Sequence, residues 1–275
     1  MDKKTEILRD LKGKVLLFGG AYSNFQALQQ LISVAEVQDI VPENCISTGD
    51  LVGYCAQPEE TVQLFKKWGA RAIAGNVEIQ LREGSEGCGC DFTKGSRCDG
   101  YSQLWYPFAQ SQLSQDSLDF MQTLPDYLTF DYGGKKIMIV HGSYSNVSEF
   151  VFKSTGWNKK EASFNQTNCD VIIAGHCGIP FYHQRNEKLW INAGVIGMPA
   201  NDGTPRVWYI ILDDEKGVFS FKHHAMDYDH NTASKLMDNG LLPESYAKTL
   251  ITGVWDNCEI LPPVETGLQG YALNL

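Results

Sequence analysis

The chain lacks a long apolar run and is short of positive charge. Its 275 residues carry 23 lysines and arginines against 33 aspartates and glutamates, so the net charge is −10 at pH 7. Binding to nucleic acid without regard to sequence requires a basic face, and this composition argues against a nucleic-acid partner. A small phosphate-bearing substrate remains compatible with the acidic balance, because a bound cation reverses the local electrostatics.

Also missing is any stretch that would serve as a signal peptide or a membrane span, since residues 1–14 are polar and charged. We therefore expect a cytoplasmic protein with no membrane partner. In a reducing compartment the eight cysteines are expected to be thiols or metal ligands rather than disulfides.

What the chain does have is an alternation of short apolar runs with helical patterns, which predicts an α/β domain. Glycines 133 and 134 indicate a hairpin between two of the strands. The expected strands are residues 15–18, 45–47, 70–74, 127–132, 135–140, 171–174, 189–192, 206–212 and 218–225.

Helices are expected after Asn24, which can cap a helix, and over residues 58–67 and 113–124. Residues 79–100 are rich in glycine and cysteine and have no period, so they are expected to form a long loop. No repeat or linker divides the chain. We expect one domain over residues 1–228 and a C-terminal helical extension over 229–275 that packs on it or mediates a homodimer.

Four polar side chains follow predicted strands, each beside a glycine: Asp50, Asn76, His141 and His176. If these strands are parallel, their carboxyl ends lie along one edge of a sheet, where ligands bind in such folds. The mixed nitrogen and oxygen ligands suit one divalent cation such as Mn, Fe or Zn. A structural histidine or an Asx turn is the simpler alternative for each residue taken alone.

The segments around these residues, 49–54, 75–78, 139–142 and 175–178, and the stretch from Asn192 to Pro199 have a familiar order and spacing. From about Val15 to about Tyr228 the chain resembles the calcineurin-like metallophosphoesterase superfamily, in particular its small bacterial branch. The resemblance implies a sandwich of two mixed β-sheets flanked by helices. It also implies a hydrolase acting on a small phosphomonoester or phosphodiester, such as a nucleotide.

In that resemblance Asp50, Asn76, His141 and His176 bind a metal, and the first three are catalytic. The sequence departs from the family elsewhere. Gly20 and Tyr22 stand where the first motif has an aspartate and a histidine, and Gly178 replaces a second ligating histidine. Val77 replaces the histidine that helps to protonate the leaving group. The ligands of one metal are thus present and those of the other are lost, so we expect one divalent metal ion per chain.

Tyr22, Ser23 and Asn24 are the candidates for contact with substrate, because a helix N-terminus favours anions. Capping alone would explain Asn24, and the Tyr22 ring can also fill the space of the lost metal. Cys88, Cys90 and Cys98 are expected to be reduced thiols, with a zinc site or a redox-sensitive lid as alternatives.

Three functions remain open. The first is a phosphoesterase with a reduced, single-metal site. The second is an inactive relative that binds a phosphorylated ligand or a partner. In the third, Cys55, Cys177 or His183 replaces a lost ligand and restores two metals.

Overall fold

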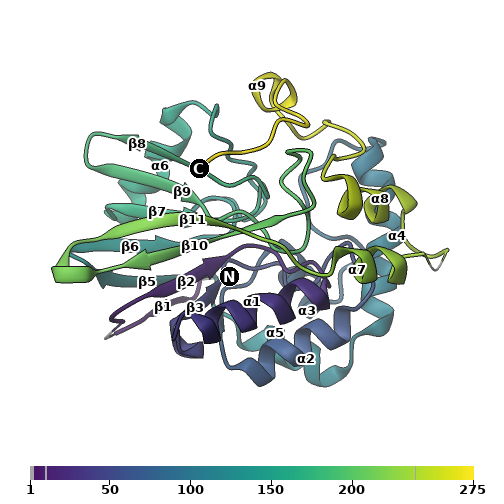
Figure 1. Cartoon of the computed structure of the whole chain (residues 1–275), viewed down its shortest axis with the longest axis horizontal. Helices are drawn as coiled ribbons and strands as arrows, with labels where there is room; N and C mark the ends of the chain where they lie inside the picture. The colour runs from purple at the N-terminus through teal and green to yellow at the C-terminus, as the bar shows by residue number, and fades with distance from the viewer. Residues whose placement is uncertain (1–2, 10, 239) are drawn as a thin grey trace.

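Two β-sheets pack face to face, with helices on both outer faces (Figure 1). The computed structural model describes residues 3–9, 11–238 and 240–275. One sheet has the strand order β1-β5-β6-β7-β9-β8, and the other has the order β11-β10-β2-β3-β4.

The strands of the first sheet are β1 (Thr5–Ile7), β5 (Tyr127–Tyr132), β6 (Lys135–Ile139), β7 (Val171–Ala174), β8 (Phe181–Arg185) and β9 (Lys188–Asn192). Those of the second are β2 (Val15–Phe18), β3 (Cys45–Ser47), β4 (Arg71–Ala72), β10 (Val207–Asp213) and β11 (Ser220–Met226). The α-helices are α1 (Phe25–Val37), α2 (Pro58–Trp68), α3 (Asn76–Glu83), α4 (Arg97–Gln112), α5 (Gln115–Thr123), α6 (Trp157–Thr167), α7 (His230–Leu236), α8 (Glu244–Thr252) and α9 (Pro263–Thr266). Two short 3₁₀ turns, Pro42–Asn44 and Glu215–Gly217, lie between strands.

Both sheets are mixed, which confirms the expected fold class. In the first, β6, β7 and β9 run parallel, β5 is parallel to β1 but antiparallel to β6, and β8 is antiparallel to β9. In the second, β2, β3 and β4 run parallel and β10 and β11 are antiparallel. The four predicted ligands therefore follow parallel strands of two sheets rather than one.

Alternation along β2 shows how the sequence specifies the layers. Val15 and Leu17 point into the core between the sheets, whereas Leu16 and Phe18 point into the core beneath the helices. Successive side chains of a strand face opposite sides, so a fully apolar strand fits only where both faces are covered. A third core lies on the far side, around Trp157 and Phe164 of α6.

The prediction of a long loop over residues 79–100 is wrong at both ends, where helices occupy part of the range. Helix α3 continues to Glu83 and stops at Gly84, which adopts φ 66°. Helix α4 begins after Ser96, whose side chain accepts a hydrogen bond from the Asp99 amide. Pro107 lies inside α4 and obscured its helical pattern in the sequence.

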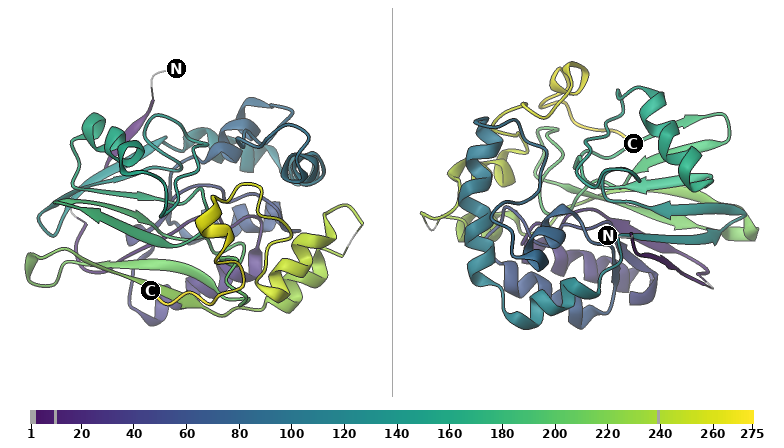
Figure 2. Two further views of the ribbon diagram at one scale, coloured as in Figure 1. Left: turned by 90° about the horizontal axis from the view of Figure 1, so that it is seen from above. Right: turned by 180° about the vertical axis from the view of Figure 1, so that it is seen from behind.

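The C-terminal segment returns across the domain after α8, as the yellow ribbon in Figure 2 shows. The Trp255 indole donates to the Pro199 carbonyl at 2.8 Å, and the Trp255 amide donates to the Asn201 side chain at 2.8 Å. Further on, the Glu265 carboxylate accepts a hydrogen bond from the Ser154 amide at 2.9 Å. These contacts hold residues 253–265 against the loops that follow the strands. In the described part of the chain, no helix combines the length and the hydropathy needed to cross a bilayer.

Candidate metal centre

The four predicted ligands meet at one atom, Nε2 of His141. That nitrogen lies 3.1 Å from Asp50 Oδ2, 3.0 Å from Asn76 Oδ1 and 2.9 Å from His176 Nδ1. All four residues are buried. The carboxylate and amide oxygens are acceptors only, so a cluster of lone pairs surrounds a single ring nitrogen.

The tautomer of His141 follows from its other nitrogen. Nδ1 lies 2.7 Å from the carbonyl oxygen of Thr48, which can only accept, so Nδ1 carries a proton and donates it. In the neutral ring Nε2 then holds a lone pair toward the cluster. An outer hydrogen bond of this kind fixes the ring orientation of histidines that bind metals.

Glycines let the loops approach closely enough to form the cluster. A side chain on Gly75 would place its Cβ 2.2 Å from Asp50 Oδ1, and one on Gly49 would come within 2.9 Å of His141 Nδ1. Asp50 itself has φ 60°, a left-handed conformation that is unusual outside glycine. The turn after β3 is therefore shaped around the position of this carboxylate.

Glu78 ties the two loops together and was not anticipated from the sequence. Its buried carboxylate accepts hydrogen bonds from the backbone amides of Gly75, Asp50 and Leu51 at 2.9, 2.7 and 2.8 Å, and a longer one from Val52 at 3.4 Å. Burial and the neighbouring Asp50 charge raise the pKa of Glu78 to about 7. The residue positions Asp50 without touching the cluster of ligand atoms.

The amide of Asn76 is held in one orientation. Its Nδ2 donates to the Cys88 carbonyl at 2.8 Å and to Cys90 Sγ at 3.3 Å, which leaves Oδ1 pointing at His141. The cysteine-containing segment expected to be a free loop thus supports a predicted ligand. All eight cysteines are free thiols.

The charges of the cluster residues are coupled to one another. Burial opposes ionisation of Asp50, but the adjacent His141 lowers the pKa of this carboxyl below its ordinary value. Burial likewise opposes protonation of His141, yet the Asp50 carboxylate raises its pKa. Burial and the neighbouring His141 lower the pKa of His176 to about 3, so this ring is neutral at pH 7. Its Nε2 is buried without a hydrogen-bond partner in the described structure.

Aromatic rings line the other side of the cluster. A Cβ placed on Gly20 would lie 2.2 Å from Cε1 of Tyr22, so this ring occupies the space beside the lost ligand position. Tyr22 is 5% exposed, and within the described residues its hydroxyl has no hydrogen-bond partner. Near Gly178, the closest side chains to a built Cβ are those of Val195 and Trp255, at 3.7 and 3.8 Å.

Ser23 and Asn24, which were predicted as substrate contacts, are not among the residues that line the cavity beside the cluster. Ser23 accepts a hydrogen bond from the Gly53 amide at 3.0 Å. Asn24 caps α1 through the Ala27 amide, and its Nδ2 donates to the Gly197 carbonyl and the Tyr228 hydroxyl. Both are buried and both are used to hold loops together, so we assign them a structural role.

The alternative replacement ligands also bond elsewhere. Cys55 and Cys177 donate to the carbonyls of Gly197 and Ile179, and His183 Nδ1 lies 3.0 Å from the Lys160 amine. Among the described residues, the metal-ligating side chains that cluster together are those of Asp50, His141 and His176.

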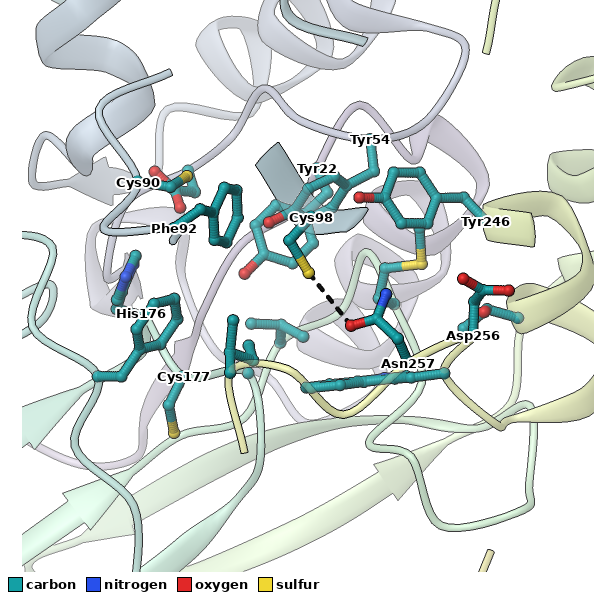
Figure 3. Close-up of a pocket in the computed structure, with 18 residues that line it drawn as sticks. Tyr22, Tyr54, Cys90, Phe92, Cys98, His176, Cys177, Tyr246, Asp256 and Asn257 are labelled. Atoms are coloured by element: carbon teal, nitrogen blue, oxygen red, sulfur yellow. Dashed lines mark hydrogen bonds between the residues drawn. The ribbon is translucent and has the colours of Figure 1, made fainter. Parts of the chain in front are cut away.

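A cavity of about 90 Å³ opens beside the cluster (Figure 3). Asp50, His176 and Tyr22 line one end of it. The C-terminal segment supplies part of its wall, including Tyr246 and Trp255. These wall residues were not identified as site residues from the sequence, because their approach depends on the path of the chain after α8.

The sequence model of the calcineurin-like phosphoesterase superfamily domain matches residues 14–217. The chain belongs to this superfamily. An uncharacterized protein of Methanocaldococcus jannaschii is 25% identical over 260 residues, covering 88% of this chain and 99% of the relative.

Solved structures share the fold of this superfamily member. A hypothetical protein of Pyrococcus horikoshii aligns with a TM-score of 0.73 at 18% identity, covering 88% of this chain and 99% of that one. A metallophosphoesterase from Sphaerobacter thermophilus aligns with a TM-score of 0.68 at 21% identity, covering 89% of this chain and all of that one (100%).

The superfamily typically binds divalent metals, and the cluster fits such an ion. Three acceptor atoms surround His141 Nε2, which can carry at most one proton, so hydrogen bonds alone leave lone pairs facing one another. A cation would satisfy all four donor atoms. Among the described residues, no second group of three or more histidine, cysteine or acidic side chains lies together on the side of Gly20, Tyr22 and Gly178.

Proposed function

We propose that this protein is a metal-dependent phosphoesterase with a single-metal site. Asp50, Asn76, His141 and His176 would hold one divalent ion, with Mn, Fe or Zn favoured by the mixed oxygen and nitrogen ligands. The substrate would be a small phosphomonoester or phosphodiester. The observation that carries the proposal is the convergence of three ligand atoms on a fourth, His141 Nε2.

When bound, such an ion supplies a polarised phosphoryl oxygen and a water of lowered pKa. The chain's own residues define the rest. Asp50 and Asn76 follow the strands β3 and β4, and the two histidines follow the strands β6 and β7. The four residues therefore fix the site from both sheets. Tyr22 points a hydroxyl without a partner toward the cavity, where it can donate to a phosphoryl oxygen. Val77 has no proton to give, so no group at that position assists the leaving group.

The test measures metal content per chain and hydrolysis of bis(p-nitrophenyl) phosphate, for wild type and His141→Ala. His230→Ala serves as the control because His230 lies outside the cluster, on α7. We expect about one metal per chain and activity in wild type and control, and loss of both in His141→Ala. Metal binding without hydrolysis of any phosphoester would overturn the enzymatic proposal.

Metal binding without hydrolysis would instead support a second candidate, a non-catalytic protein that binds a phosphorylated ligand or a partner. Val77, which stands in place of the family's histidine, and the loss of the second metal's ligands favour it. The free thiols fit the proposed cytoplasmic location. The predicted homodimer stays a prediction, which sedimentation analysis would test.

A further inference from the structure

The cavity beside the ligand cluster has an unusual lining for a site that binds phosphate. Among the described residues that line it there is no lysine or arginine. Its carboxylates are those of Asp50 and Asp256. The guanidinium of Arg97 is paired with the lining residue Asp256 at 2.6 Å, and the Arg97 side chain is more than half exposed.

The charge of the site follows from the proposed metal. One divalent cation and the Asp50 carboxylate leave a net charge of +1 on the ion and its ligands, because Asn76 is neutral and histidines bind metals in their neutral form. A phosphodiester carries one negative charge and would cancel this charge. A phosphomonoester or a polyphosphate carries about two or more at neutral pH and would leave negative charge unpaired in a poorly hydrated wall.

The wall itself is aromatic. The Phe150 ring lies against the ligand His176, with 4.4 Å between ring centroids, and Phe92 stacks on Phe150 at 6.3 Å. Opposite, Tyr54 meets Tyr22 and Tyr246 edge to face, at 4.7 and 5.0 Å. Rings arranged in this way bury an apolar or aromatic group and offer little to a second anionic group.

The size of the cavity limits the buried group. At about 90 Å³ it is well below the roughly 300–1,000 Å³ of pockets that enclose drug-sized ligands. A single ring or a short alkyl chain fits inside it.

We propose that the ligand of this site is a phosphodiester monoanion with one small apolar or aromatic arm, which packs between Phe150 and the C-terminal wall. The proposal rests on the proposed function, since it uses the single cation in the charge count. It specifies the substrate class that the fold leaves open.

The experiment uses two non-hydrolysable ligands that differ in charge, methyl phenylphosphonate and phenylphosphonate. Their binding to the Mn-loaded full chain is measured by calorimetry at a pH above the second pKa of phenylphosphonic acid, where phenylphosphonate is a dianion. We expect the monoanion to bind at least about tenfold more tightly. Equal or tighter binding of the dianion, or no binding of either, would overturn the proposal.

A third ligand tests the arm. Methyl methylphosphonate keeps the charge and removes the ring, and we expect its binding to be about tenfold weaker than that of methyl phenylphosphonate. Equal binding of the two would show that the aromatic wall does not select the arm.

A variant pair tests the missing cation. Ile260→Lys adds a charge to the cavity wall, and Val264→Lys adds the same charge at a site that is 61% exposed and outside the cavity. We expect Ile260→Lys to reduce the preference for the monoanion at least about fivefold and Val264→Lys to preserve it. Should Ile260→Lys fail to fold, the ligand comparison on wild type still decides.

Hydrolysis separates this proposal from the function on which it rests. Turnover of p-nitrophenyl phosphate in preference to its methyl ester would keep the phosphoesterase and reject the monoanion. Preferential binding of the monoanionic phosphonate without turnover of either ester would reject the phosphoesterase and keep the ligand class.

Discussion

The two sides of the candidate metal site differ in what packs there. On one side, His141 Nε2 is surrounded by donor atoms, and Glu78, Thr48 and the Cys88 carbonyl hold those donors in place. On the other side, Tyr22 covers the glycine at a lost ligand position. Gly178, at another such position, lines the cavity. The ring beside Gly20 thus packs part of this space, as expected of interiors that tolerate few voids. We call the side with the ligand atoms the intact half and the side with Tyr22 the repacked half.

The largest effect is expected from removing a ligand of the intact half. His176→Ala should lower metal affinity by more than about 100-fold, because a direct ligand contributes more than the outer partners that typically account for 10–100-fold. Elemental analysis and titration with Mn measure this. His230→Ala should retain the metal. Full metal content in His176→Ala would place the ion elsewhere.

Next in size is the loss of the support beneath the intact half. In the wild type, several backbone amides donate to the two oxygens of the Glu78 carboxylate. Glu78→Gln leaves them a single carbonyl oxygen, so we expect the free energy of unfolding to fall by about 3 kcal/mol. Metal affinity should fall about tenfold or more with it. Chemical denaturation and metal titration report the two effects, with Glu83→Gln at the exposed end of α3 as the control.

The opposite result would be that Glu78→Gln loses metal but keeps the stability of the wild type. It would show that the carboxylate affects metal binding alone and that its four backbone hydrogen bonds add nothing to the stability of the fold.

The repacked half can be probed by crowding it. Gly20→Ala would bring a Cβ within 2.2 Å of the Tyr22 ring, and we expect destabilisation of about 2 kcal/mol. In a Tyr22→Ala background the same change should cost much less, because the obstructing ring is gone. A double-mutant cycle of unfolding free energies measures the coupling. Additive effects would mean that Tyr22 does not fill this space.

The smallest change concerns a single hydroxyl. Tyr22→Phe should alter the free energy of unfolding by less than about 0.5 kcal/mol, since no hydrogen bond is lost. Under the proposed function its KM should rise about tenfold. Tyr106→Phe removes a hydroxyl that donates to the Ser85 carbonyl, outside the cavity, and controls for the change of residue type. An unchanged KM in Tyr22→Phe would show that Tyr22 contributes only the packing of its ring.

The sequence was most informative where chemistry is local. Asp50, Asn76, His141 and His176 each follow an apolar run beside a glycine, and the glycine pair at 133–134 marks a hairpin, so the strands and the cluster could be predicted. Helix α4 could not, because Pro107 interrupts its pattern.

Longer-range features escaped prediction for a different reason. The role of Glu78 depends on backbone amides from two loops, and no side-chain pattern encodes them. Phe150 and Trp255 reach the cavity only through the path of the folded chain. The start of α1 was ambiguous in sequence, since a capping residue and an anion site look alike. Burial of Ser23 and Asn24 distinguishes the two.

The position of the cavity wall in the chain bears on when the protein becomes competent during synthesis. The predicted ligands lie between residues 50 and 176, whereas the wall residues Tyr246, Trp255 and Ile260 follow them by 70 residues or more. Because a chain is synthesised from its N-terminus, the ligand cluster can assemble before its wall has been made. Metal capture and ligand selection can then be separated in time.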